Sequence, residues 1–194
     1  MGKLGIYGGT FAPIHNGHVR AAKAFMEQMW LDVLFVIPTG NSPHKEMSGG
    51  ASDADRLEMC RRAFAGVEGV IVSDLEIRRE GKSYTVDTMT ELKKNYPDDE
   101  LYLIMGSDML LCFDRWYRYE DILSMATICA TTRQGDISLD ELKAYSRDVL
   151  KKDTLIIDFE PFECSSTKVR DTLISGDDAT DLVPEKVLRY ITDK

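Results

Sequence analysis

The chain has 194 residues, of which 43% are hydrophobic and 29% charged, which is the composition of a soluble globular protein with a sizeable core. Its formal net charge of −9 argues against a general nucleic-acid binder, which needs a basic face, but local cations could still hold a small anion. The first residues form no signal peptide, and no apolar run approaches the roughly 20 residues of a membrane span. We therefore expect one domain, residues 1–194, in the cytoplasm, with no nucleic-acid or membrane partner.

Apolar runs of strand length alternate with segments of helical periodicity along the whole chain. The expected strands are residues 4–7, 33–38, 70–72, 101–105, 127–131 and 155–159. The expected helices are residues 19–30, 53–64, 120–124, 139–150 and 184–191, with two more that begin after residues 83 and 164. This alternation predicts an α/β fold, a Rossmann-like doubly wound and mainly parallel sheet with flanking helices. Pro184 is expected at the first position of the last helix.

The four cysteines are widely separated and include no Cys-x-x-Cys pair. Their spacing is typical of neither a disulfide framework nor a zinc knuckle. We expect reduced thiols, three of which fill the core. The four are Cys60, Cys112, Cys129 and Cys164.

Residues 8–18, Gly-Gly-Thr-Phe-Ala-Pro-Ile-His-Asn-Gly-His, join the first expected strand to the first expected helix. Ligands of open α/β sheets bind at such junctions. Gly8 and Gly9 allow close backbone approach, and His15 and His18 stand where free N–H groups and the helix dipole favour an anion. The segment therefore predicts a phosphate site.

Two other interpretations of these histidines exist. They could simply begin the helix without a catalytic role, or His15 and His18 could bind zinc together with His44. The zinc interpretation is weak because no acidic or cysteine ligand has matching spacing.

A second phosphate site is predicted at Ser165-Ser166-Thr167, which opens a helix with Arg170 one turn further on. Hydroxyl groups, a helix N-terminus and a guanidinium together can clamp a phosphate, although a plain Ser-capped helix is the simpler alternative. Ser165 and Lys168 also match the Ser-x-x-Lys of β-lactamases, but the accompanying Ser-Asp-Asn and Lys-Thr-Gly motifs are absent.

Two shorter motifs add candidate ligand contacts. Gly106-Ser107-Asp108 follows an expected strand, so Asp108 would either accept a hydrogen bond from a ribose hydroxyl or cap the next helix. Lys45 in Ser42-Pro43-His44-Lys45 is a candidate cation for phosphate, in what could otherwise be any exposed turn. Walker A and Gly-x-Gly-x-x-Gly motifs are absent, which argues against P-loop kinases and dehydrogenases.

The sequence Gly-Gly-Thr-Phe-x-Pro-Ile-His-x-Gly-His resembles the signature of the His-x-Gly-His nucleotidyltransferase superfamily. The long form is most similar to bacterial nicotinate-mononucleotide adenylyltransferases, whose Pro-Pro-His-Lys, Gly-Ala/Ser-Asp and Ser-Ser-Thr-x-x-Arg motifs resemble those described above. The resemblance therefore extends from residue 8 to residue 170. The chain departs from the pattern at Ala12, where the family usually has Asp, and at Cys164, where Ile is common.

This resemblance implies that the chain transfers an adenylyl group from ATP, with Mg²⁺, to nicotinate mononucleotide, giving nicotinate adenine dinucleotide and pyrophosphate in NAD biosynthesis. It implies His18, His15 and Arg170 as catalytic residues. The implied ATP contacts are Gly8, Gly9, Thr10, Phe11, His15, His18, Gly106, Asp108, Ser165, Ser166, Thr167 and Arg170. The implied mononucleotide contacts are Asn41, Lys45, Thr85, Trp116 and Arg133.

Several alternatives stay open. The acceptor could be nicotinamide mononucleotide, and the oligomeric state, a homo-oligomer included, is not fixed by the sequence. Pantetheine-phosphate adenylyltransferases share His-x-Gly-His but are shorter and lack the longer motifs. An aminoacyl-tRNA synthetase core would need a late Lys-Met-Ser-Lys-Ser loop. Ala12 is the one hint of a nucleotide-binding sensor without catalysis.

Overall fold

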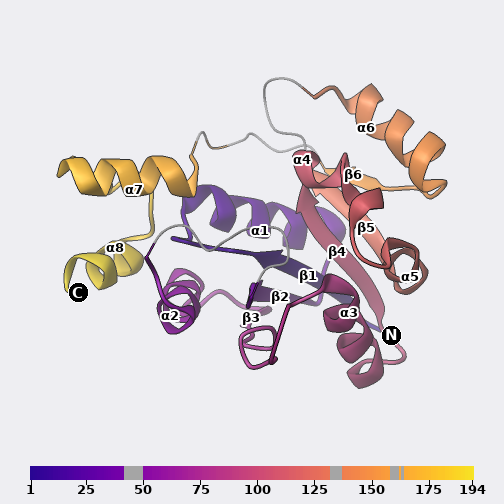
Figure 1. Ribbon diagram of the computed structural model, residues 1–194, viewed down its shortest axis with the longest axis horizontal. Coiled ribbons are helices and arrows are strands. Elements are labelled where there is room, and N and C mark those ends of the chain that lie inside the picture. The colour runs from indigo at the N-terminus through magenta and orange to yellow at the C-terminus, as the bar shows by residue number, and fades with distance from the viewer. Residues whose placement is uncertain (42–49, 132–136, 158–161, 163) are drawn as a thin grey trace.

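The computed structural model describes residues 1–41, 50–131, 137–157, 162 and 164–194. Its centre is a six-stranded sheet with the order β3-β2-β1-β4-β5-β6, in which every neighbouring pair is parallel (Figure 1). The strands are β1 (Lys3–Gly9), β2 (Val33–Pro38), β3 (Val70–Val72), β4 (Glu100–Gly106), β5 (Ala126–Thr131) and β6 (Leu155–Ile157). The predicted doubly wound α/β fold is confirmed.

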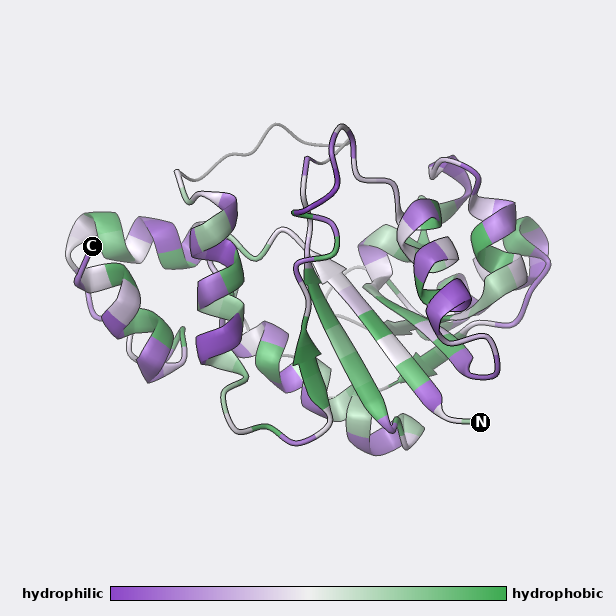
Figure 2. Ribbon diagram, turned by 90° about the horizontal axis from the view of Figure 1, so that it is seen from below, coloured by the Kyte–Doolittle hydropathy of each residue, from purple (hydrophilic) through white to green (hydrophobic). Residues whose placement is uncertain are grey.

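Helices cover both faces of this sheet, as the hydropathy view makes plain (Figure 2). The helices are α1 (Asn16–Met29), α2 (Asp53–Ala63), α3 (Thr85–Asn95), α4 (Ser107–Leu110), α5 (Tyr119–Met125), α6 (Leu139–Tyr145), α7 (Ser166–Ser175) and α8 (Glu185–Thr192). Two short turns add to them, the 3₁₀ turn η1 (Phe113–Arg115) and the π-helical turn η2 (Ser146–Leu150).

Alternate residues of each central strand enter two separate hydrophobic clusters. In β2, Phe35 and Ile37 join a core made with α3, α5 and α6, whereas Leu34 and Val36 join a core made with α1, α2, α7 and α8. Both faces of the strand are therefore buried, which explains why residues 33–38 are apolar without interruption.

The sheet order places the ligand edge at β1. Successive strands run outward from β1 in one direction to β3, and the chain then returns beside β1 to build β4, β5 and β6 on the other side. Gly9 is in register with Pro38, and Gly106 with Thr131, so these carboxyl-terminal strand ends share one edge. This is the topological switch point, where doubly wound proteins bind ligands.

The elements depart from prediction in a few places. The expected helix 139–150 changes to a π turn at Ser146, whose hydroxyl donates to the Leu142 carbonyl oxygen at 2.9 Å. Pro184 is the N-cap of α8 rather than its first residue. The short elements α4 and η1 were not predicted because neither is long enough to show a period. The end of the expected sixth strand, residues 158–159, lies outside the described residues.

The cysteines are free thiols, and three of them contribute to the core. Cys60 and Cys129 are buried in it, and the half-buried Cys164 packs against it, whereas Cys112 belongs to neither hydrophobic cluster. None of the helices in the described part of the chain combines the length and apolar character needed to cross a membrane.

Candidate functional site

The loop after β1 packs tightly on the start of α1. Phe11 is 2% exposed, has a φ of 49°, and turns its ring edge toward the His18 ring at a centroid distance of 5.1 Å. A Cβ atom on Gly9 would come within 2.9 Å of the Phe11 ring, whereas one on Gly8 would meet nothing within 4 Å. Gly9 is therefore required by packing, and Gly8 leaves exposed backbone at the edge of the sheet.

The two histidines of this segment interact directly. His15 is the N-cap of α1, and its backbone N–H donates to Nδ1 of His18 at 3.2 Å. The two rings lie 3.7 Å apart between centroids, tilted by 31°. When Nδ1 accepts this bond, a neutral His18 carries its proton on Nε2, so that Nε2 is a hydrogen-bond donor.

The N-terminus of α7 lies against the same loop, although Ser166 and Pro13 are 153 residues apart in sequence. Ser166 donates from Oγ to the Pro13 carbonyl oxygen at 2.9 Å, and Arg170 donates from Nη1 to the Ala12 carbonyl oxygen at 2.7 Å. Arg170 also donates from Nη2 to Oγ1 of Thr167 at 3.1 Å, and Ser165 caps α7 by accepting from the Lys168 N–H. The two predicted phosphate sites are therefore brought together.

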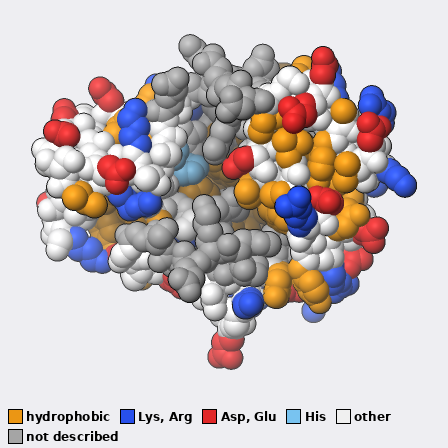
Figure 3. All heavy atoms as spheres, turned by 45° about the horizontal axis from the view of Figure 1, so that its top comes forward, with side chains coloured by type: hydrophobic (Ala, Val, Ile, Leu, Met, Phe, Trp, Pro, Cys, Tyr) orange, Lys and Arg blue, Asp and Glu red, His pale blue; other side chains and the backbone are white. Residues whose placement is uncertain are grey.

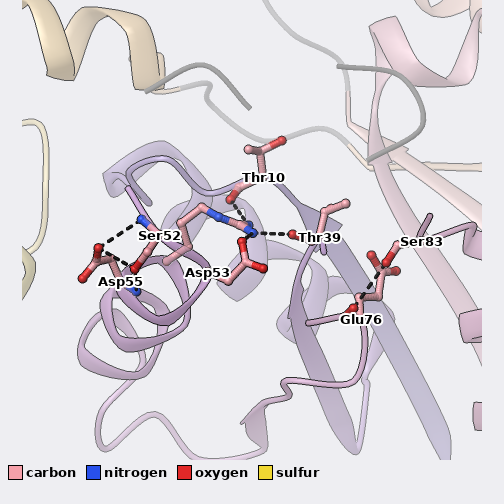
Figure 4. A network of polar contacts seen from close by, with 8 residues as sticks. Thr10, Thr39, Ser52, Asp53, Asp55, Glu76 and Ser83 are labelled. Atoms are coloured by element: carbon pink, nitrogen blue, oxygen red, sulfur yellow. Dashed lines mark hydrogen bonds and ion pairs between the residues drawn. The ribbon is translucent and has the colours of Figure 1, made fainter. Parts of the chain in front are cut away.

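A buried arginine that the sequence analysis missed lies beneath the loop. Arg56 in α2 is fully buried and donates to the carbonyl oxygens of Thr10 and Thr39 at 2.8 and 2.6 Å (Figure 4). It also pairs with Asp53 at 2.7 Å. Its position was a signal, because Arg56 falls on the buried face of α2 together with Leu57, Met59 and Cys60.

A buried carboxylate lies close to this arginine. Glu76 is 7% exposed, and burial raises its pKa, although the Thr88 hydroxyl, Arg79 and the Gly40 N–H oppose that rise. Thr88 donates from Oγ1 to Oε1 of Glu76 at 2.9 Å. The sequence analysis gave Glu76 no role, since nothing in its neighbourhood marks it as buried.

Three of the five residues expected to bind the mononucleotide lie within the described part of the chain. Asn41 is exposed and accepts at its carbonyl oxygen from the Ser83 N–H at 2.9 Å, and Thr85 begins α3. Trp116 is half-buried, with its ring 5.1 Å from that of Phe113. Lys45, Arg133 and His44 lie outside the described residues.

The turn that precedes Trp116 is held in place by Tyr145, the last residue of α6. Tyr145 donates from its hydroxyl to Oδ1 of Asp114 at 2.7 Å and accepts from the Asp114 N–H at 3.2 Å. Burial and the Asp114 carboxylate raise the pKa of Tyr145 to about 12, so the phenol stays protonated and keeps donating. This contact fixes η1, the turn that leads to Trp116.

On the ATP side, Gly106 ends β4 and precedes α4, in which Asp108 is exposed. The space-filling view shows a hollow near the middle of this face with a histidine side chain at its floor (Figure 3). Within the described ranges, no group of three or more His, Cys, Asp or Glu side chains could hold a metal ion.

Comparisons with known proteins agree with this geometry. Residues 6–172 match the family described as cytidylyltransferase-like. The chain is 34% identical to a "Probable nicotinate-nucleotide adenylyltransferase" of Clostridium tetani, covering 98% of this chain and 96% of that protein. It is 38% identical to one of Neisseria meningitidis, covering 100% and 97%.

A solved structure supports the fold. The nicotinic acid mononucleotide adenylyltransferase of Plasmodium falciparum, complexed with NaAD, matches with a TM-score of 0.80 at 18% identity, covering 100% of this chain and 96% of that chain.

Proposed function

Since the chain belongs to the cytidylyltransferase-like family, and within it to the nicotinate-nucleotide adenylyltransferases that its relatives represent, we propose that it transfers the adenylyl group of ATP to nicotinate mononucleotide. The products are nicotinate adenine dinucleotide and pyrophosphate, a step of NAD biosynthesis. The observation that carries the proposal is the meeting of two helix N-termini, those of α1 and α7, on one loop at the switch point of the sheet.

The reaction is a substitution at the α-phosphorus of ATP. A 5′-phosphate oxygen of the mononucleotide forms a new P–O bond, the bond from the α-phosphorus to the bridging oxygen breaks, and pyrophosphate leaves with that electron pair. The nucleophile is already an anion, so neither a general base nor an enzyme nucleophile is needed. The protein must hold the two phosphates in line and neutralise the charge between them.

We assign the positioning of the phosphates and the neutralisation of their charge to the residues around the loop after β1. His18 donates from Nε2 to the α-phosphoryl group, and His15 assists along the phosphate chain. The backbone of residues 8–11 lies beside them, and Arg170 holds the β- and γ-phosphates with the hydroxyl groups of the α7 N-terminus. Gly106 and Asp108 bind the nucleoside. The hydroxyl groups are those of Ser165, Ser166 and Thr167.

Mononucleotide binding is assigned to Asn41, Lys45, Thr85, Trp116 and Arg133. Mg²⁺ enters as part of the substrate, bound to the ATP phosphates and its own waters, because this ion dehydrates reluctantly and seldom uses an all-protein cage. The single-domain organisation, the cytoplasmic location and the oligomeric state stay predictions.

The test is pyrophosphate release from MgATP with three acceptors in parallel: nicotinate mononucleotide, nicotinamide mononucleotide and 4′-phosphopantetheine. We expect nicotinate mononucleotide to give the highest kcat/KM. A higher value with either of the others would reassign the substrate. Absence of turnover with all three, together with ATP binding by calorimetry, would indicate a nucleotide sensor instead.

A further inference from the structure

The peptide group between Thr39 and Gly40 lies between the buried Arg56 guanidinium and the backbone of Glu76. Arg56 donates from Nη2 to the Thr39 carbonyl oxygen at 2.6 Å. On the other side of this peptide, Gly40 packs directly against the Glu76 backbone. The segment after β2 is thus held by a charge-assisted hydrogen bond on one side and by close packing on the other.

The ionic partner of Arg56 does not account for the burial of its charge. The Arg56 side chain is 0% exposed, whereas its ionic partner Asp53 is 51% exposed and largely solvated. The other two acceptors of its guanidinium are neutral carbonyl oxygens, and the buried Nε has no hydrogen-bond partner. Such burial is costly, and an apolar side chain would fill the space with less loss.

Arg56 and Glu76 contact different halves of the proposed site. Through Nη1, Arg56 also holds the carbonyl oxygen of Thr10, in the loop assigned to the ATP phosphates. Glu76 accepts from Thr88 on α3, the helix that begins at Thr85.

Close packing at Gly40 fixes the distance between the ATP loop and the mononucleotide side of the site. A Cβ atom on Gly40 would lie 2.3 Å from the Glu76 carbonyl oxygen, so only glycine fits at this position. The Ser83 side chain also reaches that oxygen, at 3.3 Å, and the Ser83 N–H donates to the Asn41 carbonyl oxygen at 2.9 Å. Asn41 and Thr85 are both assigned to the mononucleotide, so the contacts of Gly40 with Glu76 and Ser83 support the mononucleotide side of the site.

We propose that Arg56 is a positioning residue whose guanidinium holds the Thr10 loop to the peptide between Thr39 and Gly40, which packs on Glu76, and that this Arg56 brace sets the distance between the ATP loop and the mononucleotide pocket. The proposal rests on the proposed adenylyl transfer. A misplacement of about 1 Å between reacting groups can cost about a hundredfold in rate. The brace therefore acts on kcat rather than on the binding of either substrate alone.

The decisive variant is Arg56→Lys, which keeps the charge but cannot hold two carbonyl oxygens with one rigid fork. Arg61→Lys is the matched control, because Arg61 lies exposed on the same helix. In folded R56K protein we expect kcat to fall ten- to a hundredfold, with the KM for each substrate within about threefold of the parent.

Amide hydrogen exchange of the free protein supplies a readout that does not depend on turnover. R56K should accelerate exchange both in peptides covering residues 8–14 and in peptides covering residues 37–41, and leave α8 unchanged. Normal kcat in folded R56K would overturn the brace. So would faster exchange in only one of the two segments, or a rise in one KM alone. If the parent fails to use any acceptor, the proposed function fails, and the exchange pattern still decides on the brace.

Discussion

Substitutions of His18 can separate its two ring nitrogens. Nδ1 accepts from the His15 N–H at the start of α1, which leaves Nε2 as the donor for the α-phosphoryl group. In His18→Asn the side-chain oxygen occupies the place of Nδ1, so the contact with His15 is kept and the donor is lost. In His18→Gln the amide nitrogen reaches the place of Nε2, and in His18→Ala both functions are lost.

The magnitudes follow from these contacts. Removing one donor to the developing charge of a transition state costs about 10²–10³ in kcat. H18N and H18A should therefore both fall by about two to three orders of magnitude, and H18Q should retain more activity than either. Removing a helix-capping contact costs about 1 kcal/mol, so H18A should be less stable by that amount and H18N should stay close to the parent.

The assay is pyrophosphate release at saturating MgATP and nicotinate mononucleotide, together with urea unfolding of each variant. Lys23→Ala, exposed on α1, serves as the control and should change neither measurement. Parent-like kcat in folded H18N would refute the assignment of Nε2 as the donor. A loss of activity that follows the loss of stability across the three variants would show that His18 only caps the helix.

Three further predictions concern other contacts of the site. Arg170→Ala should raise the KM for ATP about ten- to a hundredfold in steady-state kinetics, since hydrogen bonds of a charged group are worth about 1.5–3 kcal/mol; a rise in the mononucleotide KM alone would contradict the phosphate clamp. Burial raises the pKa of Glu76 above the usual 4.5, so the folded protein binds this proton more tightly than the unfolded chain. Its free energy of unfolding should therefore fall as the pH rises from about 4.5, and urea titrations of E76Q that show the same fall would exclude Glu76 as the cause. Tyr145→Phe should cost about 1–2 kcal/mol in urea unfolding and raise the mononucleotide KM by loosening the turn before Trp116, and an effect on the ATP KM only would argue against this.

The sequence was most informative where the hydrophobic periodicity changes from that of a strand to that of a helix. The strand before residue 8 and the helix after residue 15 have different hydrophobic repeats, so the loop between them could be placed at the sheet edge from the pattern alone. The helix start at Ser165 could be predicted because hydroxyl residues before a helix have a local capping geometry. That α7 lies on the Ala12 and Pro13 carbonyl oxygens could not be predicted, since this contact depends on the tertiary fold.

The buried charges escaped prediction for a physical reason. Arg56 stands among five other charged residues in the segment from Asp53 to Arg62, and such a segment normally forms a solvated helix face. Its partners are backbone carbonyl oxygens, which any residue type provides and which therefore leave no trace in the sequence. Glu76 was missed because its partner, the Thr88 hydroxyl on α3, is brought to it only by the tertiary fold.

The same reliance on backbone oxygens explains how Ala12 fits a functional loop. The carbonyl oxygens of Thr10, Ala12 and Pro13 accept from Arg56, Arg170 and Ser166, so the loop is held without any side chain at position 12. Ala12 is 6% exposed, and a carboxylate there would be largely desolvated beside the Arg170 contact. We therefore expect the natural chain to be active and Ala12→Asp to change kcat by no more than about tenfold, or about 1.4 kcal/mol of barrier. Measuring both proteins with MgATP and nicotinate mononucleotide checks this. A parent without turnover that gains it in A12D would instead make the missing carboxylate essential and the natural chain an inactive nucleotide binder.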